Sequence, residues 1–96
     1  MLTIQEIKEK VAKIGAKYGI KNAYLFGSYA TGHANEESDV DLIIEKGALH
    51  TYDAYADMKL ELTNELGTNV DLLTTDGVRP RFFELIKNDR ILLYGA

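Results

Sequence analysis

The sequence predicts one small domain of the α/β or α+β class, in which helices pack on a β-sheet. Short apolar runs bounded by glycine alternate along the chain with longer segments whose apolar residues recur every three or four positions. This is the pattern of strands alternating with helices. The chain has 96 residues, of which 46% are hydrophobic and one is proline. Residues 1–96 are therefore expected to fold around a single core.

A long amphipathic helix is expected over residues 3–18. Thr3 and Glu6 have the spacing of a capping box, in which each side chain bonds the backbone of the other residue. Gly19 supplies the left-handed residue that commonly ends a helix. The helix would bury the apolar side chains that recur at steps of three and four, namely Ile4, Ile7, Val11, Ile14 and Tyr18.

The next segment predicts two buried strands separated by a short helix and a loop. Residues 23–26 form an apolar run that is closed by Gly27, where a tight turn leads into one or two helical turns. Residues 33–38 are polar and predict a loop. Residues 40–45 contain three apolar side chains in succession and give the strongest strand signal of the chain.

The remaining third of the chain continues the alternation. Residues 51–66 have helical spacing and are followed by Gly67, and residues 70–73 predict a further strand. Residues 80–89 predict a helix whose first residue is proline, a residue that suits that position. For residues 91–94, two interpretations stay open: a terminal strand or an extended tail.

Composition narrows the class of partner. The net charge is −4, and a protein that binds nucleic acid by neutralising phosphates usually has a basic face. Glutamates interrupt a cluster of lysines in and just after the first helix, so the cluster predicts a solvated face: Lys8, Lys10, Lys13, Lys17 and Lys21. We expect no nucleic-acid partner.

The chain has no cysteine and no apolar run of signal-peptide or membrane-spanning length, so a soluble cytoplasmic protein is expected.

Three aspartates stand where their charges are out of place. Asp39 and Asp41 open the strongest strand, and side chains two apart on a strand project from the same face. Asp71 interrupts another apolar run. If the two strands are neighbours, the three carboxylates converge, which is a usual way to hold one or two Mg²⁺ ions for phosphoryl transfer. Aspartates are common at strand starts, so Asp39 and Asp41 alone would favour a structural role.

A glycine and a serine upstream favour a functional role for these aspartates over a structural one. Gly27 and Ser28 follow a predicted strand, where the backbone and the Ser28 hydroxyl can approach phosphate oxygens closely. The order and spacing of these motifs resemble the signature of the polymerase beta-like nucleotidyltransferases, in which a Gly-Ser pair is followed after ten residues by Asp-x-Asp. Here these are Gly27-Ser28 and Asp39-Val40-Asp41. The resemblance is greatest to the minimal (MNT-type) members and covers nearly the whole chain. It implies the nucleotidyltransferase fold, a small mixed β-sheet with helices packed on it.

The resemblance also implies a role for each residue of the signature. Gly27 and Ser28 would bind the β- and γ-phosphates of ATP. Asp39 and Asp41 would be catalytic ligands of two Mg²⁺ ions, and Asp71 would complete the metal site beside the attacking hydroxyl. Thr31 is a departure, because many family members have an arginine there that contacts phosphate.

The resemblance implies a partner as well. MNT-type proteins are typically antitoxins paired with a helical HEPN toxin, and they can transfer AMP from ATP to a tyrosine of that toxin. We expect no additional acceptor-binding domain in 96 residues, which agrees with a protein acceptor. Two other interpretations stay open: an antitoxin that neutralises the toxin by binding alone, and a nucleotidyltransferase for a small-molecule hydroxyl. A homo-oligomer is possible under any of the three.

Overall fold

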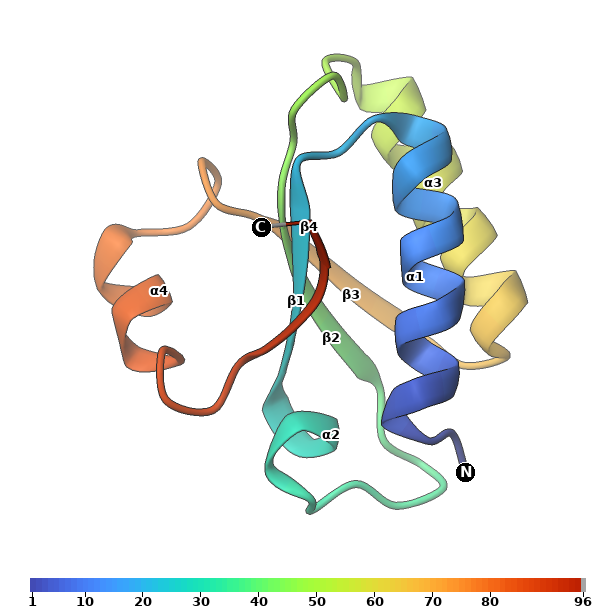
Figure 1. Cartoon of the computed structure of the whole chain (residues 1–96), viewed down its shortest axis with the longest axis vertical. Coiled ribbons are helices and arrows are strands. Elements are labelled where there is room, and N and C mark those ends of the chain that lie inside the picture. Colours follow the sequence, from blue (N-terminus) through green and yellow to red (C-terminus); the bar gives the residue numbers. More distant parts are fainter. Residues whose placement is uncertain (96) are drawn as a thin grey trace.

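The computed structural model describes residues 1–95 as a four-stranded sheet with helices on both faces (Figure 1). Two long helices, α1 and α3, cover one face, and the short helix α4 lies on the other. The strand order is β3-β2-β1-β4, with β2 and β3 parallel and the other pairs antiparallel. The elements are α1 (Ile4–Tyr18), β1 (Asn22–Phe26), α2 (Gly27–Thr31), β2 (Val40–Glu45), α3 (Tyr52–Leu66), β3 (Val70–Thr74), α4 (Pro80–Leu85) and β4 (Ile91–Gly95).

The long helices begin and end where their capping residues predict. Thr3 and Glu6 form the expected capping box, with both bonds at 3.1 Å, and Gly19 ends α1 in the left-handed conformation. At the start of α3, the Thr51 hydroxyl accepts a hydrogen bond from the backbone of Ala54. Caps of this kind satisfy backbone groups that a helix end leaves unpaired, so they fix the boundaries locally.

The core lies between the sheet and the pair α1 and α3. On β2, Val40, Leu42 and Ile44 are fully buried in this core, together with apolar residues of both helices. Asp41 and Ile43 alternate with them and therefore project from the opposite face of the sheet. The face that carries Asp41 is covered only in part, by α4.

The last helix is shorter than the sequence predicts. Helical spacing suggested residues 80–89, but α4 ends at Leu85 and residues 86–89 form turns. Arg90 explains the early end. Its guanidinium donates to the Phe83 carbonyl at 2.9 Å, and its backbone N–H bonds the Ile86 carbonyl. These bonds satisfy carbonyls at the helix end and lead the chain into β4, so the open question about residues 91–94 is answered as a strand.

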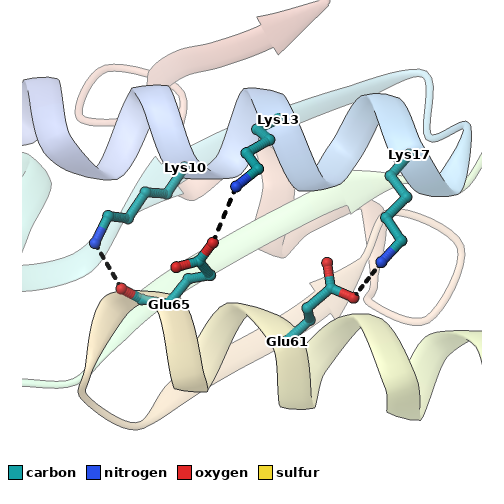
Figure 2. A network of polar contacts seen from close by, with 5 residues as sticks. All are labelled: Lys10, Lys13, Lys17, Glu61 and Glu65. Carbon is teal, nitrogen blue, oxygen red and sulfur yellow. Dashed lines mark hydrogen bonds and ion pairs between the residues drawn. The ribbon is translucent and has the colours of Figure 1, made fainter.

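Lys8, Lys13 and Lys17 of α1 are exposed, as predicted, whereas Lys10 is half-buried. Three of the lysines of α1 also connect this helix to α3 (Figure 2). Lys13 pairs with Glu65 at 3.2 Å and Lys17 with Glu61 at 2.6 Å. Lys10 donates to the backbone carbonyl of Glu65 at 2.7 Å. Exposed pairs of this kind add little stability each, so the apolar core, and not these lysines, holds the two helices together.

None of the helices in residues 1–95 is both long enough and apolar enough to cross a membrane.

Gly67 gives a direct test of the boundary of α3. Its φ is 69°, and a Cβ there would contact nothing within 4 Å, so substitution adds backbone strain without a clash. We expect Gly67→Ala to lower the free energy of unfolding by about 1 kcal/mol, because the left-handed conformation is costly for residues with a Cβ. Gly67→Asn should cost less, since asparagine tolerates this conformation. Urea denaturation measures both, and equal losses would contradict the explanation.

Candidate active site

The parallel pairing of β2 and β3 brings two carboxylates together. Asp41 and Asp71 are aligned Cα partners in this pair, so both side chains project from the face of the sheet opposite α1 and α3. Asp39 lies directly before β2 and is exposed. The condition set by the sequence, that the two strands be neighbours, is therefore met. The chemical roles assigned to the three aspartates remain a prediction.

The pairing has an electrostatic cost. Partial burial, a hydrogen bond with Asp71 and the negative charges of Asp71 and Asp39 together raise the pKa of Asp41 to about 6. The ion pairs found within residues 1–95 lie elsewhere and involve none of these aspartates. Carboxylates that share a site without a cation disfavour one another's ionised form. This part of the sheet is therefore arranged to attract positive charge.

Gly27 lies directly against Asp41. Phe26, the residue before it, is the Cα partner of Asp41 in the pairing of β1 with β2. Gly27 has φ 71°, and a Cβ at this position would collide with the Asp41 carboxylate. Only glycine is compatible with both conditions. The sequence indicated that this glycine approaches a ligand; the structure adds that it also leaves room for the carboxylate.

The short helix α2 places Ser28 beside this contact. Ser28 is half-buried in the first turn of α2, next to Gly27. Tyr29, the next residue, is 7% exposed and packs in the core. The Gly27–Ser28 turn and the Asp41–Asp71 pair therefore lie at one end of the sheet, although they are separated along the chain.

The carboxylates of Asp41 and Asp71 suit Mg²⁺ as ligands, but they do not form a complete coordination shell. Within residues 1–95, no three histidine, aspartate or glutamate side chains are grouped so that they already hold a metal ion. Mg²⁺ commonly takes only one or two protein carboxylates, and substrate phosphates and water complete its shell. Asp41 and Asp71 supply two hard oxygen donors whose mutual repulsion a divalent cation would relieve. The residues present therefore suit Mg²⁺ delivered with a nucleotide.

Tyr55 is a neighbour of the site that the sequence did not indicate. Its hydroxyl donates to the carbonyl of Leu72, the residue after Asp71, across the edge of β3. Burial and the nearby charges of Tyr52 and Asp71 raise the pKa of Tyr55. In the sequence, Tyr55 was one of several residues at helical spacing, and nothing local distinguished it from a core tyrosine. Only the packing of α3 against β3 makes it a support for the strand that carries Asp71.

Comparison with known proteins identifies the fold and the family. A model of the family described as polymerase beta, nucleotidyltransferase matches residues 9–96. The chain belongs to this nucleotidyltransferase family. A Methanocaldococcus jannaschii protein named "putative protein adenylyltransferase" is 37% identical over 94% of this chain and 97% of its own length. A Thermococcus cleftensis protein named protein adenylyltransferase MntA is 28% identical over 82% of this chain and 84% of its own length.

Solved structures confirm the small mixed-sheet nucleotidyltransferase fold. One described as a putative minimal nucleotidyltransferase superposes with a TM-score of 0.80 at 33% identity, covering 92% of this chain and 90% of that one. A toxin–antitoxin structure with AMP-PNP gives 0.80 at 22% identity, covering 93% and 73%. A complex of a tri-AMPylated Shewanella oneidensis HEPN toxin with its MNT antitoxin gives 0.73 at 20%, covering 96% and 72%.

Gly27→Ala tests the contact between the glycine turn and Asp41. The roles predicted for these residues imply a complex with ATP and Mg²⁺, and we expect Gly27→Ala to weaken that complex at least about tenfold, because the methyl group displaces the carboxylate. Gly32→Ala is the matched control: Gly32 also has positive φ, 80°, but a Cβ there meets nothing within 4 Å. Isothermal titration calorimetry measures both variants. Equal losses would mean that backbone strain, and not the contact with Asp41, explains the effect.

Asp41→Asn tests the electrostatic cost. The folded-state pKa of about 6 lies above the ordinary value of 3.8, so wild-type stability falls as the pH rises between these values and stays lower above them. We expect Asp41→Asn to stabilise the metal-free protein by about 1 kcal/mol at pH 8, after allowance for solvent screening, and not at all below pH ~4. Urea denaturation at both pH values measures this. The control is Asp57→Asn, which changes an exposed carboxylate of α3 and should not stabilise the protein. If Asp41→Asn is no more stable than the wild type at pH 8, the electrostatic cost assigned to Asp41 is wrong.

Proposed function

We propose that this chain transfers AMP from ATP to a tyrosine hydroxyl of a helical HEPN-type toxin, with Mg²⁺, and thereby acts as the antitoxin. The proposal rests on one observation above all. Asp41 and Asp71 are paired on one face of the sheet and the Gly27 turn lies against Asp41, so candidate metal ligands and a candidate phosphate-binding turn adjoin. Phosphoryl transfer needs these two parts next to each other, since catalysis there is mainly positioning and charge stabilisation.

In the proposed reaction, the residues of this chain hold and orient the reactants. The Gly27–Ser28 turn receives the β- and γ-phosphates, and Asp39, Asp41 and Asp71 hold Mg²⁺. When bound, Mg²⁺ would neutralise charge on the phosphates and on the departing pyrophosphate. The acceptor oxygen forms a bond to the α-phosphorus while the bond from that phosphorus to the bridging oxygen breaks. Asp71, exposed at the start of β3, accepts the hydroxyl proton, and pyrophosphate leaves.

The comparisons support the choice of nucleotide and acceptor. Relatives of similar length are named protein adenylyltransferases, and an AMPylated HEPN toxin occurs with an MNT antitoxin of the same fold. The toxin–antitoxin structure with AMP-PNP supports ATP as the donor. The openness of the site agrees with a protein acceptor. Asp39 and Asp71 are exposed and Asp41 is half-buried, whereas sites for small molecules usually enclose most of the ligand.

One observation favours a second candidate function. Thr31 stands where many family members have a phosphate-binding arginine, so a chain that had lost catalysis would still fit the fold. Such a chain would be an antitoxin that neutralises its toxin only by forming a complex. Catalysis and complex formation are separable by experiment, because the first needs the aspartates and the second needs only the surface.

The test uses α-labelled ATP, Mg²⁺ and a HEPN-type helical protein as the acceptor, for which the gene next to this one is the first to examine. We expect the label to reach a tyrosine of that protein. We expect an Asp39→Asn/Asp41→Asn double variant to reduce labelling by at least about 100-fold, because a bound metal supplies several kcal/mol of charge stabilisation. Mass spectrometry locates the modified residue, and removal of Mg²⁺ with a chelator should abolish labelling of the wild type.

A control variant and a growth assay complete the test. Asp57→Asn, which changes an exposed carboxylate of α3, should label the partner at the wild-type rate. If the double variant binds the partner but no longer protects growing cells, catalysis is required. If the double variant protects the cells fully, this chain is an antitoxin that acts by binding alone. The same conclusion follows if the wild-type protein leaves the partner unlabelled.

A further inference from the structure

The loop after α2 contains a histidine that the proposed reaction leaves unused. We propose that His33 binds the β- or γ-phosphate of the nucleoside triphosphate and that Thr31 positions its imidazole for this contact. The inference rests on the proposed function, because it assigns a further substrate-binding residue to the same site. It starts from a chain of hydrogen bonds that connects His33 to the Gly27–Ser28 turn.

The hydrogen bonds define which ring nitrogen is free. The Thr31 hydroxyl lies 3.2 Å from the carbonyl oxygen of Gly27 and 3.4 Å from that of Ser28. Carbonyl oxygens only accept, so the single hydroxyl proton of Thr31 is donated to them. His33 Nδ1 lies 3.0 Å from the same Thr31 oxygen, to which we assign the acceptor role in this contact. Nδ1 carries the proton in this contact, and Nε2 is the nitrogen left for a ligand.

The backbone holds the same residue in place. The N–H of His33 donates to the carbonyl of Ser28 at 2.9 Å, so His33 is tied to α2 through both its main chain and its side chain. A ring that is already oriented loses less freedom when it binds. His33 is nevertheless exposed, so its free nitrogen can be reached from solvent.

The position of Thr31 directs the histidine toward the site. Residues three and four apart are neighbours on a helix surface, so Thr31 lies one turn beyond Gly27 and on the side of α2 that also carries Ser28. The side of the helix at Gly27 is the one that abuts the Asp41 carboxylate. His33, bonded to Thr31, is therefore held beside the turn where the phosphates are proposed to bind.

The chemistry suits a phosphate ligand. With protons on both nitrogens the imidazole is a cation, and Nε2 then donates a charge-assisted hydrogen bond to a phosphate oxygen. Glu36 and Glu37 follow in the same loop, but within residues 1–95 no ion pair includes His33. No carboxylate of the described residues therefore competes with a ligand for the His33 ring. A nucleoside monophosphate lacks the two outer phosphates and would not gain from this contact.

Calorimetric titration with ATP and with AMP, in Mg²⁺, tests the proposal on three proteins. We expect His33→Ala to weaken ATP binding by about tenfold and AMP binding by less than about twofold, because only the contact to the outer phosphates is lost. The matched control is His50→Ala, which removes the other of the two histidines. His50 is exposed in the loop between β2 and α3, at the opposite end of the sheet from α2 (Figure 1). It should bind both nucleotides like the wild type.

The outcomes separate this proposal from the proposed function. If His33→Ala binds ATP as tightly as His50→Ala does, or weakens ATP and AMP equally, the assignment of His33 is wrong while the nucleotidyltransferase function stands. If the wild type binds no ATP, the proposed function itself fails. Nitrogen NMR of the wild type gives an independent check on Thr31. The His33 ring should show its proton on Nδ1 in the neutral form and lose that preference in Thr31→Val.

Discussion

The candidate site depends on one pairing: the parallel alignment of β2 with β3, which sets Asp41 beside Asp71. On the other face, β2 and β3 bury apolar side chains in the core, namely Val40, Leu42, Ile44, Val70 and Leu72. Burying those side chains makes the register rigid, because a slip of one residue would move the apolar side chains out of the core. The hydrophobic core therefore holds the carboxylates together against their repulsion. Partial burial, the hydrogen bond with Asp71 and the neighbouring negative charges together raise the pKa of Asp41 to about 6.

The other parts of the site adjoin this pair through contacts that are equally specific. Gly27 gives the Asp41 carboxylate its space, and Tyr55 supports the edge of β3 from α3. On the open face, α4 packs through edge-to-face aromatic contacts, Phe82 with Phe26 and Phe83 with Tyr24, at centroid distances of 5.6 and 5.9 Å. The face that carries the aspartates is thus covered by α4 on the β1 side and left open at β3. A large acceptor can approach from the open side.

Local signals were sufficient for most elements of the fold. Thr3, Gly19 and Gly67 have capping roles that act within a few residues, so the boundaries of α1 and α3 could be predicted from the sequence. The end of α4 could not, because Arg90 caps it from beyond the predicted helix. Whether residues 91–94 form a strand depended on the availability of the β1 edge, which is a property of the assembled sheet.

By itself, the sequence determined the chemical groups and the elements that carry them: the Gly27–Ser28 turn, the aspartates at two strand starts and a single small domain. Periodicity and capping encode these locally. The tertiary structure decided that β2 and β3 are neighbours in register and that Gly27 touches Asp41. Distances between residues far apart in the chain are set by how the core packs, and short-range patterns carry no information about them.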